Sequence, residues 1–387
     1  MDEKMMRATI AGIFEDIAEA LETGSFNKKV RVGLTILGSE HGADELASGA
    51  ELASKQNPDI EVVLIGRGVE SHLELVEAAD EKEAHAKMDE LLLSGDLDAA
   101  VTMHYPFPIG VSTVGMVVTP AKGKEMFLAT TTGTSATERV TAMLRNTLYG
   151  IATAKACGRQ NPSVGILNID GARQVERALV KLQEAGYPLS FAESARSDGG
   201  IIMRGNDLLL GVPDVMVTDS LTGNVLMKVF SAYSSGGNYE ALGLGYGPGV
   251  GENYDRIICI ISRASGAPVI AGAINFAAQC ARGKLLDKAR AEFSAAKKAG
   301  WDQLIQSLAA ADTAKKGETA DIAPPPKKIV SADIPGIEVM EIEDAVQVLW
   351  KENIYAESGM GCTGPIIMVA PDDKERAVEL LRENGYL

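Results

Sequence analysis

The chain has few of the residues that cross-link small folds or hold metal ions. Among 387 residues there are four cysteines, four histidines and two tryptophans. The cysteines are far apart, form no CxxC pair and do not cluster with histidines at zinc spacing. We therefore expect neither a disulfide framework nor a structural zinc site, and a reducing cytoplasm is the simplest setting.

Long apolar runs are also missing. No apolar segment reaches the roughly 18 residues that a membrane-spanning helix needs. Acidic residues interrupt the first 24 positions, where a signal peptide would have an apolar core, and their pattern predicts an amphipathic helix instead. A net charge of −16 argues against nucleic acid and membrane surfaces as partners. An anionic substrate would need a local pocket of cations or N–H groups.

Nucleotide-binding fingerprints are absent as well. The glycine-rich segment 243–251 fails the GxGxxG pattern in every register, and Pro248 stands where a helix would begin. We predict a flexible, lid-like loop there. No GxxxxGK[ST] element occurs elsewhere. We therefore expect no dinucleotide, triphosphate or other cofactor.

Apolar strands alternate with amphipathic helices over most of the chain, which predicts an α/β fold with a mostly parallel sheet flanked by helices. The predicted strands cover residues 30–37, 60–65, 99–103, 115–118, 125–129, 164–168, 189–193, 212–217, 256–262 and 269–274. The predicted helices cover residues 43–55, 70–79, 84–94, 134–157, 172–185 and 276–311, the last broken at Gly283 and Gly300.

The composition changes after residue 310. Residues 311–337 are rich in Lys, Ala and Asp and contain three consecutive prolines, which predicts a linker. Residues 338–387 predict a small α-β-α module, with helices at 341–352 and 373–384 and a strand at 366–370. We therefore divide the chain into a body (1–310), a linker and a C-terminal module.

The segment 205–228 contains the most informative turn. An apolar strand stops at Thr218, and an amphipathic helix starts within the next few residues. Free N–H groups and a positive dipole end at a helix start bind an oxyanion without a metal. Thr222 or Asn224 would cap the helix and touch the same ligand, although ordinary capping explains these residues equally well. The candidates here are Asp219, Ser220, Thr222, Gly223 and Asn224.

Two other turns carry candidate residues. Thr132, Gly133, Thr134 and Ser135 lie at the start of the predicted helix 134–157. They form either a second anion cradle or an N-cap. His41 follows the first strand and is a candidate general base, or else a solvated turn histidine. In a parallel sheet it would share an edge with residues 219–224.

Charged groups near these turns are also candidates. Glu40 would orient His41. Arg173 and Lys228 lie just past strand–helix turns, where they would supply positive charge or else cover a solvated helix face.

Cys362 stands in the glycine-rich turn 358–365. The neighbouring glycines let the backbone approach closely, and the N–H groups of Gly361, Thr363 and Gly364 would lower the thiolate pKa and hold an oxyanion. Cys362 is therefore a candidate nucleophile, with a space-filling turn residue as the alternative. We expect the other three cysteines, Cys157, Cys259 and Cys280, in the core.

Residues 162–168, the next helix and the block GVPDVMVTDSLTGNVLMK resemble the phosphate acyltransferases of phospholipid synthesis, most strongly at residues 219–224. Those enzymes move an acyl group from an acyl-carrier thioester to phosphate, on the fold of phosphate acetyltransferases, with isopropylmalate dehydrogenase-like topology. The resemblance covers residues 30–285. The chain departs from the family's Asp-Ala-Met-Gly-Gly-Asp loop at residues 37–42, which disfavours a long-chain acyl-carrier substrate.

Over its full length, including the Gly-Met-Gly-Cys-Thr-Gly-Pro tail, the chain resembles more closely the alpha subunits of component C of glycine/sarcosine/betaine reductase. The resemblance implies that a selenoprotein carrier (component A) delivers the substrate group and that component C releases it as acetyl phosphate. It also implies a beta subunit as partner, inorganic phosphate as substrate and an oligomer. Cys362 would carry the acetyl group.

Two other functions stay open. A free-standing phosphate acyltransferase would use acyl-carrier thioesters without a selenoprotein. A non-catalytic subunit would only position a catalytic chain, with the tail and linker used for docking. The missing nucleotide fingerprint disfavours a dehydrogenase of related topology.

Overall fold

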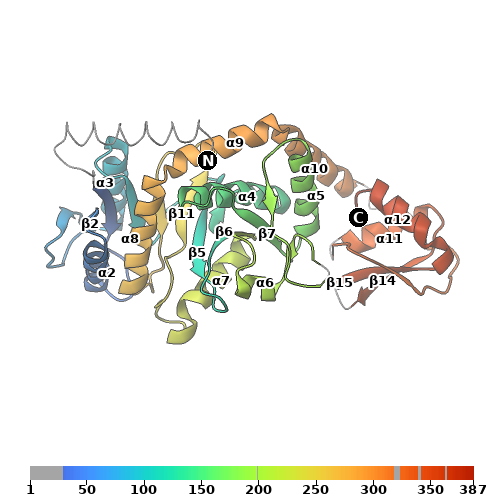
Figure 1. Cartoon of the computed structure of the whole chain (residues 1–387), viewed down its shortest axis with the longest axis horizontal. Coiled ribbons are helices and arrows are strands. Elements are labelled where there is room, and N and C mark those ends of the chain that lie inside the picture. Colours follow the sequence, from blue (N-terminus) through green and yellow to red (C-terminus); the bar gives the residue numbers. More distant parts are fainter. Residues whose placement is uncertain (1–28, 198, 318–322, 339–340, 362–363) are drawn as a thin grey trace, which may run out of the picture.

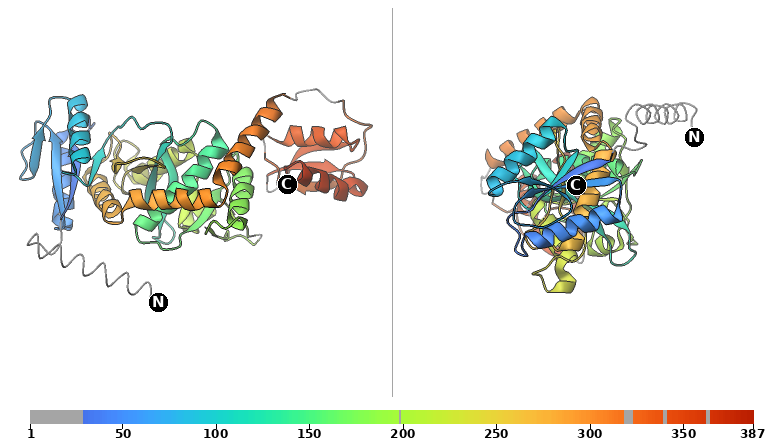
Figure 2. Two further views of the ribbon diagram at one scale, coloured as in Figure 1. Left: turned by 90° about the horizontal axis from the view of Figure 1, so that it is seen from above. Right: turned by 90° about the vertical axis from the view of Figure 1, so that its left-hand side faces the viewer.

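The computed structural model describes residues 29–197, 199–317, 323–338, 341–361 and 364–387. The predicted N-terminal helix (1–24) lies outside the described residues. Figure 1 shows an elongated molecule with the first strands at one end and the C-terminal module at the other, and Figure 2 shows the same order from two further sides. No helix in the described ranges has the length and apolarity needed to cross a membrane.

A twelve-stranded sheet forms the body and consists of two parallel blocks joined by two antiparallel strands. The first block holds, in spatial order, β3 (Glu74–Glu77), β2 (Ile60–Gly66), β1 (Val30–Thr35), β4 (Ala99–Thr102) and β12 (Ile258–Ile260). The second holds β6 (Glu125–Thr134), β10 (Val215–Val217), β7 (Ser163–Leu167) and β8 (Ser190–Phe191). The short strand β9 (Ile202–Met203) also pairs with β7. Between them lie β11 (Gly247–Gly251) and β5 (Val111–Val118).

The two blocks run in opposite directions. The pairs β12–β11, β11–β5 and β5–β6 are all antiparallel, so the direction reverses three times between the blocks. The carboxyl ends of the first block therefore lie at the sheet edge opposite to those of the second.

Helices cover the sheet and confirm the predicted fold class. They are α2 (Ala43–Gln56), α3 (Glu81–Ser94), α4 (Arg139–Ala156), α5 (Ala172–Glu184), α6 (Gly205–Leu210), α7 (Ser220–Ala232), α8 (Ala267–Arg282), α9 (Leu285–Lys298) and α10 (Trp301–Gly317). The short 3-10 helix η1 (Tyr233–Ser235) follows α7. The central helix α4 is buried along most of its length, and Tyr149 on it packs against Phe293 of α9.

Several predicted elements are wrong, each for a local reason. Residues 70–79 contain the edge strand β3 rather than a helix, and a half-exposed edge tolerates its polar residues. Residues 269–274 belong to α8, where burial on several sides makes the sequence as apolar as a buried strand. The predicted loop 243–251 contains β11, which is wholly buried between β12 and β5. A Cβ on Gly247 would lie 1.8 Å from the carbonyl oxygen of Val114, so glycine permits this close strand pairing.

The C-terminal module has its own sheet and core. Its elements are β13 (Ala332–Pro335), α11 (Ile342–Lys351), β14 (Ala356–Gly361), β15 (Gly364–Val369), η3 (Pro371–Asp373) and α12 (Lys374–Glu383), and its strand order is β13-β15-β14. The predicted helices and strand are present. The predicted turn 358–365, however, is mostly strand, and the predicted linker includes the end of α10 and all of β13.

Candidate functional site

The start of α7 follows β10, as predicted, but its cap is Asp219. Oδ1 of Asp219 accepts a hydrogen bond from the Thr222 N–H at 2.7 Å, and its carbonyl oxygen accepts from the Gly223 N–H at 3.0 Å. Within the described chain, the N–H groups of Ser220 and Leu221 donate no hydrogen bond. The N–H groups available to an anion are therefore those of Ser220 and Leu221, which precede the predicted capping residues Thr222 and Asn224 in the chain.

Gly223 and Asn224 hold α7 against β6. The Asn224 Nδ2 donates to the carbonyl oxygen of Thr131 at 3.1 Å. A Cβ on Gly223 would lie only 1.7 Å from the carbonyl oxygen of Thr130. These two residues therefore fix the spacing between helix and strand.

A cavity of about 180 Å³ opens at this turn. It is lined by Thr130, Gly133, Thr134, Ser135, Ala136, Thr137, Arg139, Ala142, Asn146, Asp219, Ser220 and Leu221. Both predicted turns contribute, because β6 and β10 are parallel neighbours with Ala129 opposite Val217. The cavity therefore joins two segments that are about 85 residues apart in sequence.

The threonine-rich turn differs from its prediction. Residues 132–134 continue β6, and α4 begins only at Arg139, with Glu138 as its cap. Thr132 pairs with Thr113 of β5 and does not line the cavity.

Arg139 is a cavity residue that the sequence analysis missed. Its Nη1 lies 3.3 Å from Oδ2 of Asp170 and 3.8 Å from Oδ2 of Asp219, and its side chain is 49% exposed. The prediction that the helix starts at Thr134 placed this arginine inside the helix. Its actual position as the first helical residue brings a cation to the two strand ends.

A buried polar network forms one wall of the cavity. The Ser135 hydroxyl donates to Oγ of Ser112 at 3.0 Å and also contacts the Asn146 amide oxygen. Asn146 Nδ2 donates to the carbonyl oxygen of Thr218 at 3.1 Å. This network ties the end of β6 to the end of β10.

His41 lies far from this cavity. It is exposed at the end of β1, and its ring packs against Tyr239, with 5.1 Å between ring centroids. Tyr239 follows the C-terminal end of α7, whereas the cavity is at the N-terminal end. The 13 residues of α7 span about 20 Å. The predicted shared edge is wrong, because the two blocks of the sheet are antiparallel.

The two predicted cations face other groups. Lys228 Nζ lies 2.5 Å from Oε1 of Glu240, a fully buried carboxylate that also accepts hydrogen bonds from Tyr246 and Ser265. Burial raises the pKa of Tyr246. Arg173 pairs with Glu176 one turn along α5. Neither cation lines the 180 Å³ cavity at the start of α7.

Cys259 and Cys280 are buried, and burial raises the pKa of both thiols. Cys157 is half-buried. Cys362 and Thr363 lie outside the described residues. Gly361 and Gly364 on either side of them are paired across β14 and β15. In the described ranges, no group of three or more His, Cys, Asp or Glu could hold a metal ion.

Comparisons with known proteins give consistent matches. A family model described as "Fatty acid synthesis protein" matches residues 30–368. The chain is 59% identical to the "Glycine/sarcosine/betaine reductase complex component C subunit alpha" of Peptoclostridium acidaminophilum, over 99% of both chains. Phosphate acyltransferases of Thermotoga petrophila and Thermus thermophilus are 28% identical over 52% of this chain and 67% and 70% of theirs.

Among solved structures, a branched-chain phosphotransacylase from Enterococcus faecalis superposes with a TM-score of 0.47 and 16% identity, over 65% of this chain and 99% of that one. The range matched by the family model includes every residue that lines the 180 Å³ cavity at the start of α7, and it extends into β15.

Proposed function

Because the chain belongs to the family of alpha subunits of component C of the glycine/sarcosine/betaine reductase complex, we propose that it transfers an acetyl group from a protein-bound thioester to inorganic phosphate. The product is acetyl phosphate. The beta subunit of component C and the selenoprotein carrier are its partners, in the cytoplasm. The phosphate acyltransferase relatives support the same reaction class.

The cavity between β6, β10 and the starts of α4 and α7 is the observation that carries this proposal. It offers the N–H groups of Ser220 and Leu221, the hydroxyl group of Thr134 and the Arg139 guanidinium. Phosphate fits such a set, because a helix N-terminus and an arginine both favour a small oxyanion. The chain as a whole carries a net charge of −16, so an anion is not favoured elsewhere on its surface.

The chemistry consists of two acyl transfers without oxidation or reduction. In the first, the Cys362 thiolate attacks the carbonyl carbon of the partner's acetyl thioester, a new C–S bond forms, and the partner's thiolate leaves. In the second, an oxygen of hydrogen phosphate attacks the acetyl carbon on Cys362. The new C–O bond replaces the C–S bond, and the phosphate proton passes to the departing sulfur.

Arsenolysis of acetyl phosphate by the isolated chain tests this function. The wild-type chain should hydrolyse acetyl phosphate in the presence of arsenate. In the reverse reaction acetyl phosphate acetylates Cys362 and phosphate leaves; arsenate then takes the acetyl group from the cysteine, and the resulting acetyl arsenate hydrolyses in water. Cys362→Ala should abolish the activity, whereas Cys157→Ala, which removes a half-buried thiol of the body, should retain it. Wild-type turnover by Cys362→Ala would exclude the covalent step, and an inactive wild-type chain would indicate a non-catalytic subunit.

A further inference from the structure

Glu338 of the C-terminal module is buried against the start of α5, with only 8% of the residue exposed. One carboxylate oxygen accepts the Arg173 N–H at 2.5 Å, and the other accepts the Gly171 N–H at 3.3 Å. Gly171 is the N-cap residue, in the left-handed region at φ 85°, and has no side chain to cap the helix. The helix therefore takes its capping acceptor from the module.

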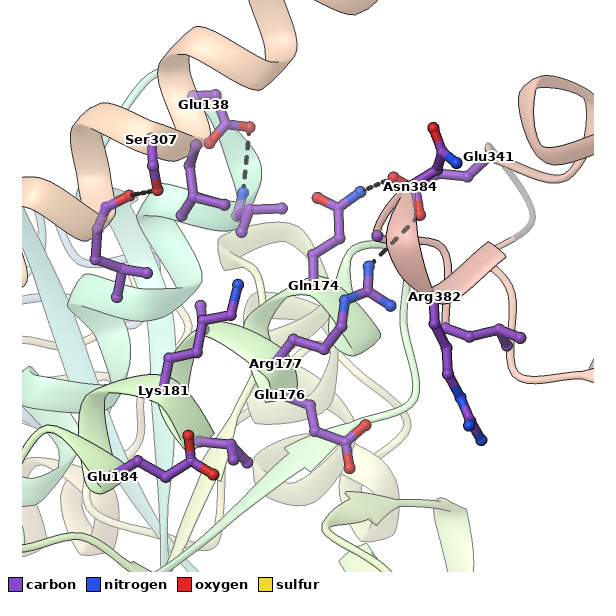
Figure 3. A pocket seen from close by; sticks show the side chains of 17 residues that line it. Glu138, Gln174, Glu176, Arg177, Lys181, Glu184, Ser307, Glu341, Arg382 and Asn384 are labelled. Atoms are coloured by element: carbon purple, nitrogen blue, oxygen red, sulfur yellow. Dashed lines mark hydrogen bonds and ion pairs between the residues drawn. The ribbon is translucent and has the colours of Figure 1, made fainter. Parts of the chain in front are cut away.

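A second carboxylate of the module contacts the next turn of α5. Glu341 accepts a hydrogen bond from the Gln174 amide and lies 3.9 Å from the Arg177 guanidinium (Figure 3). Two acidic residues from one segment thus meet the donors of one helix face.

Apolar packing contributes little to this contact. A groove of about 710 Å³ runs beside it, between α5, α10 and the end of the module, and its walls carry many charged side chains (Figure 3). The buried core of the module is separate from the two core clusters of the body. The position of the module therefore depends on a few polar contacts, and those of Glu338 reach the backbone N–H groups at the start of α5.

This contact adjoins the phosphate cavity. Asp170 directly precedes Gly171, and its carboxylate lies 3.3 Å from Nη1 of Arg139, which lines the cavity. The two sites follow β7 and β10, which are parallel neighbours, so their carboxyl ends share an edge.

We propose that Glu338 is a positioning residue, which docks the C-terminal module on α5 so that the acetyl-carrying cysteine is held for transfer to phosphate. This inference rests on the proposed function. Its physical basis is the pairing of a carboxylate with two backbone N–H groups at the positive end of a helix. Without that carboxylate, the N–H groups of buried Gly171 and half-buried Arg173 lose their acceptor, and only water or solvent anions can replace it.

The test combines hydrogen exchange with kinetics on the full chain. In Glu338→Ala, the amides of Gly171 and Arg173 should exchange faster, and kcat for acetyl transfer should fall roughly 10- to 100-fold, as expected for a misplaced reacting group. KM for phosphate should stay unchanged, because the cavity is untouched. Glu338→Gln keeps one acceptor and should fall between wild type and Glu338→Ala. Glu184→Ala, an exposed acid lining the same groove, should leave both measurements unchanged.

The outcomes separate the two proposals. An inactive wild-type chain would refute the acetyl-transfer function, while hydrogen exchange would still report docking. With an active wild type, faster exchange in Glu338→Ala at unchanged kcat would refute the positioning role. Unchanged exchange in both variants would refute docking by Glu338. If Glu338→Ala does not fold, the same criteria apply to Glu338→Gln.

Discussion

Asp219 makes contacts in two directions at the start of α7. One carboxylate oxygen caps the helix, and the other faces the guanidinium of Arg139 at 3.8 Å. Asp219 accepts hydrogen bonds from the N–H groups of Thr222 and Gly223. The N–H groups of Ser220 and Leu221, which line the cavity, therefore remain available to a bound anion. The sequence could identify the turn from its residue types. It could not show which donors the cap consumes, because this depends on the side-chain geometry of Asp219.

Replacing Arg139 tests whether its guanidinium binds phosphate. Arg139→Ala should raise KM for phosphate about 10- to 100-fold, the value of a charge-assisted hydrogen bond. It should change kcat less, because phosphate at saturating concentration still fills the cavity. Initial rates over a phosphate series check this. Arg159→Ala removes an exposed arginine that pairs with Glu125 and should behave as wild type. An unchanged KM in Arg139→Ala would place phosphate elsewhere.

The packing of α7 on β6 decides the site at the scale of elements. β10 and β6 end side by side, and α7 crosses back over β6 with Gly223 in contact with the Thr130 carbonyl group. Sequence periodicity predicted both strands and the helix. It did not predict that β6 extends to Thr134, because a threonine-rich strand end has the same composition as a helix cap.

Gly223→Ala tests this contact. The added methyl group would stand 1.7 Å from the Thr130 oxygen, so the helix or strand must move. Overpacking of this kind lowers the free energy of unfolding by about 1–3 kcal/mol. Gly205→Ala, at the start of α6 with open space around its Cβ, is the control and should be neutral or slightly stabilising. Urea unfolding midpoints measure both, and a Gly223→Ala midpoint equal to wild type would show that the contact is not tight.

At the scale of the whole molecule, the C-terminal module has a core of its own, separate from the two core clusters of the body. The core of the module includes Ala345, Leu349, Ile367 and Leu381, and no body residue belongs to it. A unit with its own core can lose stability without the other. This agrees with the division into body and module, which remains a prediction.

Leu349→Ala tests that independence. Leu349 is fully buried in the module, and its truncation should cost about 2–5 kcal/mol there. Hydrogen exchange should accelerate in α11 and α12 and stay unchanged in α4. Leu148→Ala, a matched truncation in the core of the body, should give the reverse pattern. Acceleration in both units by either variant would indicate one cooperative structure.

The sequence by itself determined the α/β class, most helices, the buried strands and the turn that follows β10, because apolar periodicity and capping residues are local signals. The tertiary structure alone decided which strand ends meet. The three antiparallel pairings around β11 and β5 depend on contacts between distant segments, and they separate His41 from α7's first turn. The parallel pairing of β6 with β10 leaves Arg139 and Ser220 at one cavity, and side-chain packing rather than local pattern brings Glu338 to α5.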